Sequence, residues 1–206
     1  MKFPPYESLR RETEVEITIK RSVFRASIAP CTTKDEAQEF LDTVRAKYWD
    51  AVHHCYAWRL GPHGLEYRMS DDGEPSGTAG KPILFALQRA NVSDAIVVVT
   101  RYFGGVKLGV GPLARAYAEV TAMALEQAER WLVRQIVHVR VFCSYDDVST
   151  VTRIFEAADA RYTPTYSDAI TFEVDVAEEA AEAMLEEIVD KTQARAGYLK
   201  VPAERE

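Results

Sequence analysis

The feature that most limits the fold is an apolar run that leads into a glycine-rich stretch. Residues 95–99 read Ala-Ile-Val-Val-Val, without a polar interruption. A strand that is apolar on both sides needs cover on both sides, so the run predicts a central, doubly buried strand. Glycines at positions 104, 105, 109 and 111 follow, and Pro112 suits a first helical turn. We therefore expect Thr100–Gly111 to form a functional surface loop between this strand and a long helix.

Alternation and helical spacing predict the other elements before residue 135. Thr33 and Glu36 have the spacing of a capping box ahead of an amphipathic helix. A second helix is expected around Ile83–Leu87. The helix after the glycines is expected to continue to about Trp131. The expected strands are 15–19 and 23–28, joined as a hairpin, and 55–60 and 65–70, joined as a second pair.

The pattern after residue 135 predicts a smaller α+β unit. The expected strands are 137–143, 162–166 and 170–176, and the expected helices are 148–158 and 181–189. Gly197 is placed to close the last helix. The order strand–helix–strand–strand–helix is typical of a ferredoxin-like unit. We therefore predict two α+β domains, over residues 1–134 and 135–206.

Charge differs sharply between these two parts. Residues 135–206 contain 15 acidic and 7 basic residues, whereas residues 1–134 contain 17 and 18. Nucleic-acid contacts are therefore expected on the first part, and a protein contact suits the acidic part. Three cysteines without a repeated spacing argue against a disulfide framework. No apolar run is long enough to span a bilayer and no secretory signal is seen, so we expect a cytoplasmic protein without membrane contact.

The glycine-rich stretch carries cations where a helix is expected to begin. Backbone amides and the helix dipole at such a point favour an anion. The alternative is a structural elbow in which the arginines pair with acidic residues. The stretch is neither a P-loop nor a dinucleotide-binding fingerprint, because both residue orders are absent. The residues expected to bind an anion or nucleic acid are Lys81, Arg101, Tyr102, Lys107 and Arg115.

A second polar stretch, Asp71-Asp72-Gly73-Glu74-Pro75, places three carboxylates close together. They could hold Mg²⁺ or serve as an acid and a base. They could equally cap backbone amides or pair with Arg101 and Lys81, and we favour this structural interpretation. A metal ion needs more oxygen ligands than the stretch offers, so no metal and no cofactor are expected.

His53-His54-Cys55 is the third polar group of interest. Neighbouring residues of a strand point to opposite faces, so His53 and His54 are not expected to share a zinc ion. A nucleophilic pair of Cys55 with a histidine is conceivable. A cysteine within an apolar strand is more often a small core residue.

The motifs together resemble one family. Segments 54–57 (HCYA), 71–84 (DDGEPSGTAGKPIL), 99–109 (VTRYFGGVKLG) and 115–117 (RAY) resemble the IMPACT family, and its bacterial YigZ-like branch in particular. Pro112 departs from the family, in which glycine is frequent. The resemblance implies an N-terminal β-α sandwich similar to domain IV of elongation factor G and a ferredoxin-like C-terminal domain similar to domain V.

The resemblance also directs the functional hypothesis. Eukaryotic members look like regulators of translation, and the bacterial branch suggests binding of nucleic acid or ribosomes. We therefore expect a non-enzymatic regulatory protein that binds RNA, the ribosome or translation factors through the cationic glycine-rich stretch. The alternative is an enzyme for a small phosphorylated or carboxylated substrate, with a site between 71–74 and 101–107. The motif residues expected to have a functional role are His54, Asp71, Asp72 and Glu74.

Overall fold

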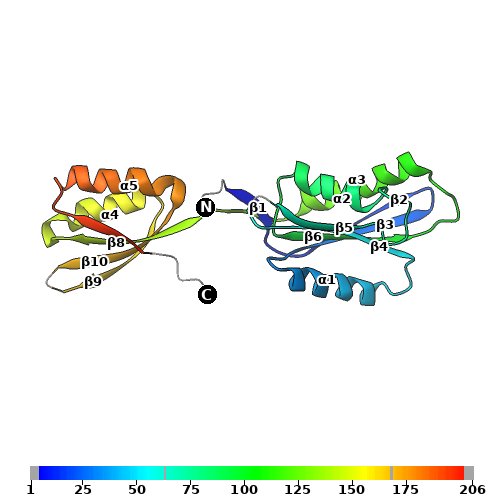
Figure 1. The fold of residues 1–206 in the computed structure, drawn as a ribbon, viewed down its shortest axis with the longest axis horizontal. Helices are drawn as coiled ribbons and strands as arrows, with labels where there is room; N and C mark the ends of the chain where they lie inside the picture. Colours follow the sequence, from blue (N-terminus) through cyan, green and yellow to red (C-terminus); the bar gives the residue numbers. More distant parts are fainter. Residues whose placement is uncertain (1–4, 63, 168, 202–206) are drawn as a thin grey trace. The chain divides into compact units, whose positions relative to one another are not determined.

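The chain forms two compact units that each contain helices and antiparallel sheets, which confirms the α+β part of the predicted fold class (Figure 1). The computed structural model describes residues 5–62, 64–167 and 169–201. The first unit ends at Val133 and the second begins at Arg134.

The first unit is built around a five-stranded antiparallel sheet. Its strand order is β2-β3-β6-β4-β5, and β1 and β7 form a separate pair. Helix α1 covers one face of the large sheet, while α2 and α3 cover the other (Figure 1). The elements are β1 (Tyr6–Leu9), β2 (Thr13–Ile19), β3 (Ser22–Pro30), α1 (Lys34–Lys47), β4 (His53–Leu60), β5 (Glu66–Ser70), α2 (Gly80–Arg89), β6 (Ala95–Tyr102), α3 (Val110–Gln127) and β7 (Arg130–Val133).

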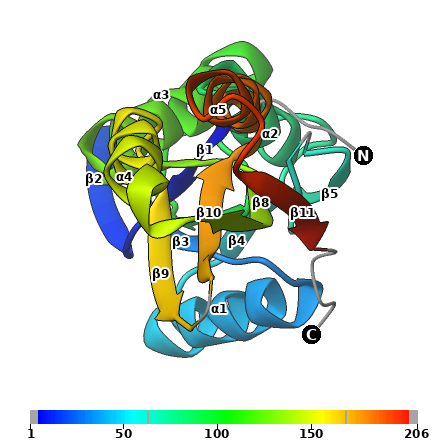
Figure 2. The ribbon, with the colours of Figure 1, turned by 90° about the vertical axis from the view of Figure 1, so that its left-hand side faces the viewer.

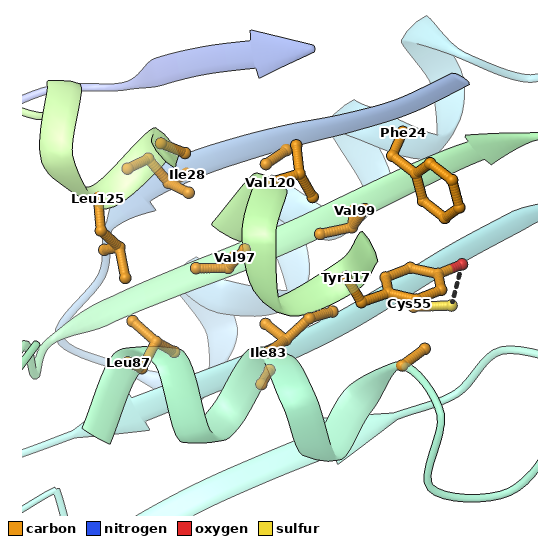
Figure 3. Close-up of a cluster of buried hydrophobic side chains, with 14 of the residues drawn as sticks. Phe24, Ile28, Cys55, Ile83, Leu87, Val97, Val99, Tyr117, Val120 and Leu125 are labelled. Atoms are coloured by element: carbon orange, nitrogen blue, oxygen red, sulfur yellow. Dashed lines mark hydrogen bonds between the residues drawn. The ribbon is translucent and has the colours of Figure 1, made fainter. Parts of the chain in front are cut away.

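Strand β6 is the central strand that the apolar run predicted. Val97 and Val99 pack toward α2 and α3 (Figure 3), whereas Ile96 and Val98 pack toward α1. All four side chains are fully buried. Strand β6 therefore contributes to the cores on both faces of the sheet. Burial of each of these aliphatic side chains stabilises the fold by about 1.5–3 kcal/mol.

Two local predictions are confirmed in detail. Strands β2 and β3 form the expected hairpin, with Lys20 and Arg21 in the left-handed region at φ 46° and 68°. At the start of α1, the Thr33 hydroxyl accepts a hydrogen bond from the Glu36 amide at 3.2 Å. The Glu36 carboxylate accepts from the Thr32 amide at 2.6 Å, one residue earlier than a standard capping box.

The predicted end of α3 is wrong. The helix stops at Gln127, and Trp131 lies in β7, where it pairs with Ser8 of β1. Arg130 donates to the carbonyl of Leu125 from Nε at 3.0 Å and from Nη2 at 2.5 Å, so it satisfies an acceptor that the ending helix leaves free. Helical spacing alone did not reveal this end, because β1 and β7 are four residues each and too short to show alternation.

The second unit has one four-stranded antiparallel sheet with α4 and α5 on one face (Figure 2). The strand order is β11-β8-β10-β9, which is the ferredoxin-like arrangement. Strand β9 confirms the strand expected near residues 162–166. The elements are β8 (Ile136–Cys143), a 3₁₀ turn η1 (Tyr145–Asp147), α4 (Val148–Ala157), β9 (Arg161–Tyr166), β10 (Ile170–Ala177), α5 (Glu178–Lys191) and β11 (Gly197–Val201).

Gly197 does not close α5, contrary to expectation. The helix ends at Lys191, and Gln193 and Ala194 make the turn with φ values of 53° and 60°. The Ala194 amide donates to the Val189 carbonyl at 2.8 Å, which stabilises this turn. Gly197 instead begins β11, a strand that the sequence did not predict.

The three cysteines, Cys31, Cys55 and Cys143, are buried and unbridged, so the expected lack of a disulfide framework is confirmed. Within the ranges that the structure describes, every helix is too short or too polar to cross a membrane.

Replacing a core side chain of β6 tests this assignment. Ile96→Ala should lower the free energy of unfolding of the first unit by about 2–5 kcal/mol, because a cavity forms where Ile96 is fully buried. Val110→Ala is the matched control, since Val110 is 66% exposed and should change stability little. Denaturant unfolding measures both, and equal effects would contradict the central position of β6.

Candidate functional site

The candidate site lies where β6 ends and α3 begins. The predicted loop is shorter than expected, because Thr100–Tyr102 belong to β6 and α3 begins at Val110. Residues 103–109 are called the glycine loop below, and residues 71–79, which precede α2, are called the acidic loop. Helices α2 and α3 pack side by side and run in the same direction (Figure 3), so their N-termini lie toward one end of the sheet.

Arg101 and Glu74 form a buried ion pair at this end. Arg101 Nη1 donates to Glu74 Oε1 at 2.5 Å, and the two side chains are 7% and 4% exposed. The Tyr117 hydroxyl of α3 donates to the same oxygen at 2.8 Å. Of the two alternatives for Arg101, the structure therefore shows pairing with the acidic loop.

Neighbouring groups hold the Arg101 guanidinium in place. Its carbon lies 5.2 Å from the ring centre of Phe24 and 5.6 Å from that of Phe103, both cation–π distances. Nη2 lies 3.4 Å from the Ser22 hydroxyl, which also accepts from the Gly104 amide at 3.1 Å. Arg101 Nε is buried and has no hydrogen-bond partner among the described residues. The arrangement links β3, β6, α3 and both loops.

Asp71 holds the start of α2. Its Oδ1 accepts from the amides of Ala79 at 3.0 Å and Gly80 at 2.9 Å, and its Oδ2 accepts from Gly77 at 2.8 Å. Burial raises the pKa of Asp71, but these hydrogen bonds outweigh it and hold the pKa below the ordinary value of 3.8. Asp71 therefore acts as the cap of α2, as the structural interpretation anticipated.

Asp72 ties the acidic loop to β4. Its Oδ2 accepts from the His54 amide at 2.6 Å, and its Oδ1 lies 3.4 Å from Arg45 Nη2 of α1. His53 and His54 point to opposite faces, as predicted: His53 Nδ1 donates to the Asp72 carbonyl at 2.7 Å, and His54 Nε2 donates to the Tyr48 carbonyl at 3.1 Å. Burial lowers the pKa of His54, which favours its neutral form.

Cys55 belongs to the core and is not a poised nucleophile. It is fully buried, and its sulfur lies 3.0 Å from the Asp71 carbonyl and 3.3 Å from the Tyr117 hydroxyl (Figure 3). Burial raises the pKa values of both the Cys55 thiol and the Tyr117 phenol. A thiol with a raised pKa stays protonated, so the core interpretation of Cys55 applies.

The glycine loop is fixed at two points and exposed between them. A Cβ at Gly104 would lie 2.1 Å from the backbone carbon of Arg21, so the close approach requires glycine. Leu108, 8% exposed, anchors the other end in the core. Gly105 and Gly109 have φ values of 82° and 84°, which glycine adopts most readily. The turn between the anchors presents Lys107 to solvent.

The start of α3 differs from the start of α2. Among the residues that the structure describes, no side chain caps α3, and the first turn of this helix contains no acidic residue. The Arg115 guanidinium folds back over this turn, since a Cβ at Gly111 would lie 3.6 Å from its Nη1. Pro112 lacks an amide hydrogen, which leaves Val110 and Gly111 as donors. Lys107 and Arg115 are exposed and form no ion pair within the described ranges.

The other two predicted residues lie elsewhere. The Tyr102 hydroxyl donates to Asp50 at 2.9 Å, and its side chain points to the α1 face because Arg101 points to the α3 face. Lys81 lies in the first turn of α2, with Nζ 5.6 Å from the Phe85 ring centre. Across the described parts of the chain, no group of three or more His, Cys, Asp and Glu side chains is arranged to hold a metal ion.

Ser22, Phe24 and Tyr117 are site residues that the sequence did not reveal. Phe24 and Tyr117 pack edge to face with ring centres 5.2 Å apart, and Ser22 contacts both Arg101 and the glycine loop. Tyr117 lies within the RAY segment of the resemblance. The sequence predicted only a core position for Tyr117, because an aromatic residue at helical spacing usually faces a core.

Known proteins are similar to this chain in sequence and in fold. The model of the Impact N-terminal domain matches residues 20–125. The chain is 41% identical over 136 residues to the IMPACT family member YvyE of Bacillus subtilis, covering 65% of this chain and 62% of YvyE. It is 35% identical over 145 residues to the IMPACT family member YigZ of Escherichia coli, covering 69% and 71%.

A solved structure extends the similarity to the whole chain. A crystal structure described as that of a hypothetical protein superposes with a TM-score of 0.65 at 28% identity, covering 99% of this chain and all of that one. An IMPACT family member of Haemophilus influenzae is 31% identical over 183 residues, covering 87% of this chain and 89% of its own. The chain is an α+β protein of two units that belongs to the IMPACT family. It is similar to the bacterial members YvyE and YigZ.

Removing one partner of the buried ion pair should be strongly destabilising. Arg101→Met or Glu74→Leu alone should lower the free energy of unfolding by about 3–5 kcal/mol, because each leaves a buried charge without its partner. The double variant should lose less than the sum of the two. Urea unfolding of all four proteins measures the coupling, and additive losses would contradict the pair.

The cap at α2 should make stability depend on pH. Because the folded pKa of Asp71 is lowered, its stabilisation is present above pH 3.8 and is lost as the pH falls through the folded value. Asp71→Asn should cost about 0.5–2 kcal/mol at neutral pH. It should also reduce the loss of stability that occurs as the pH falls below 3.8. Urea midpoints at each pH test this, and an unchanged pH profile would contradict it.

Proposed function

We propose that this protein is a translation-associated regulatory protein that binds RNA or the ribosome without catalysing a reaction. Membership of the IMPACT family supports a role in translational regulation at the level of the family. The observation that carries the binding proposal is the uncapped start of α3, flanked by the exposed cations Lys107 and Arg115. We call Lys107, the first turn of α3 and Arg115 the α3 anion surface.

This surface has the donors that a phosphate requires. The amides of Val110 and Gly111 point out of the helix start, where the helix dipole is positive. Arg115 lies beside Gly111, with Nη1 3.6 Å from the position that a Cβ would take, and Lys107 lies three residues before Val110. A phosphate there would meet backbone donors and two charged side chains at once. RNA presents such phosphates in series, so the surface fits an electrostatic contact with its backbone.

The buried part of the candidate site holds this surface in place and does not itself bind. Arg101 is neutralised by Glu74 and buried, so its proposed role is to hold the glycine loop in position. Asp71 occupies the amides at the start of α2, which leaves α3 as the open helix start of the pair. Phe103, 50% exposed beside Arg101, offers a ring on which a base could stack.

The alternative, an enzyme with its site between the two loops, receives less support. Asp71 and Asp72 accept hydrogen bonds from backbone amides, and Glu74 is 4% exposed beside Arg101. A substrate would have to break these contacts to reach the carboxylates. The exposed cations favour a binding surface over a closed catalytic pocket.

Removing the cations should weaken RNA binding. Lys107→Ala and Arg115→Ala should each weaken binding of a short single-stranded RNA several-fold at low salt. Each should also reduce the slope of log K against log salt by about 0.7, because one phosphate contact is lost. Fluorescence anisotropy over a salt series measures both quantities.

Arg68→Ala is the matched control. Arg68 is exposed on β5 and pairs across the sheet with Trp58, which faces α1. Arg68 therefore lies on the α1 face, away from the α3 anion surface. It should leave affinity and slope unchanged. The proposal fails if the wild type does not bind RNA or ribosomes at low salt, or if all three variants behave alike.

A further inference from the structure

The face formed by α2 and α3 contains a groove that the α3 anion surface does not account for. Its volume is about 660 Å³, and Pro82, Phe85 and Ala86 of α2 line one side. Ala118 and Ala122 of α3 line the other side. The groove lies entirely within the first unit and follows the direction of two helices packed side by side.

The interior of the groove is apolar and partly open to water. The Phe85 side chain is 56% exposed, although Ile83, Leu84 and Leu87 of the same helix are buried. Small side chains on α3 leave space opposite this ring, which lets another backbone approach closely. Exposure of an aromatic ring to water is unfavourable in free energy, and a partner that covers the ring would remove this unfavourable term.

The rim of the groove is positively charged. Arg89 and Arg115 line it, and Lys81 lies over the Phe85 ring at 5.6 Å. These three cations form no ion pair within the described ranges. Glu126 is the acidic residue of the lining, and Arg130, which also lines it, is already paired with Glu7 at 2.9 Å. The free charge of the rim is therefore cationic.

We propose that this groove binds an acidic amphipathic helix of a protein partner. An acidic amphipathic helix would place its narrow apolar stripe against the apolar floor of the groove. Its carboxylates would then lie against the cations of the rim. Helix α2 is ten residues long, so about three turns of a partner helix can lie along it. The apolar floor disfavours RNA, whose phosphates would face Phe85 and alanine side chains. The surface is independent of the proposed RNA contact, except that Arg115 borders both.

A synthetic peptide can test this directly. The sequence of residues 178–191, EEAAEAMLEEIVDK, has the required chemistry, with six acidic residues, one lysine and an apolar stripe. Its fluorescent form should bind the full chain at low salt. A matched peptide with lysine in place of every acidic residue should bind at least tenfold more weakly, because the rim would repel it.

Two variants of the groove make the test specific. Arg89→Glu reverses a rim charge, and Ala122→Trp fills the groove at an exposed position where folding is least at risk. Each of these two variants should weaken binding of the acidic peptide at least tenfold. The control variants Lys107→Ala and Arg68→Glu should leave the affinity for the peptide unchanged. Circular dichroism confirms that each variant is folded.

The opposite results would overturn the proposal. It fails if the acidic peptide does not bind, if the lysine peptide binds equally well, or if neither groove variant weakens binding. It also fails if Arg89→Glu and Ala122→Trp weaken RNA binding as strongly as Lys107→Ala, because the groove would then belong to the nucleic-acid surface. Failure of RNA binding alone leaves this inference intact.

Discussion

The buried ion pair between Glu74 and Arg101 is the interaction on which the rest of the site depends. It joins the acidic loop to the end of β6, and Tyr117 brings α3 to the same carboxylate. Two desolvated charges stabilise a fold only when each is well paired, so the pair restricts where both loops can lie. The exposed part of the glycine loop rests on this fixed support, between its anchors at Gly104 and Leu108.

The two helices on this face begin in different ways, and this difference is the basis of the proposed anion contact. Asp71 supplies a carboxylate to the amides at the start of α2. The start of α3 receives none, and Arg115 adds positive charge there. The acidic loop therefore satisfies the amides at the start of α2, whereas the glycine loop leaves the start of α3 open to solvent.

The sequence was most informative where local pattern and burial agree. The Ala95–Val99 run identified the central strand, and Thr33 identified the start of α1. It was least informative where distant residues decide the outcome. Trp131 fits helical spacing but pairs with β1, more than 120 residues earlier in the chain. Ser22 and Tyr117 meet Arg101 and Glu74 only through the tertiary fold, so no spacing could identify their roles.

The central claim is that an RNA phosphate binds at α3 while the buried pair and the cap of α2 stay unchanged. Amide chemical shifts measured during titration with a short single-stranded RNA test it most directly. The account predicts progressive shifts at Lys107, Val110 and Gly111, with the Ala79 and Gly80 amides on Asp71 unmoved. Shifts concentrated in the acidic loop or in the second unit, or no shifts at all, would contradict it.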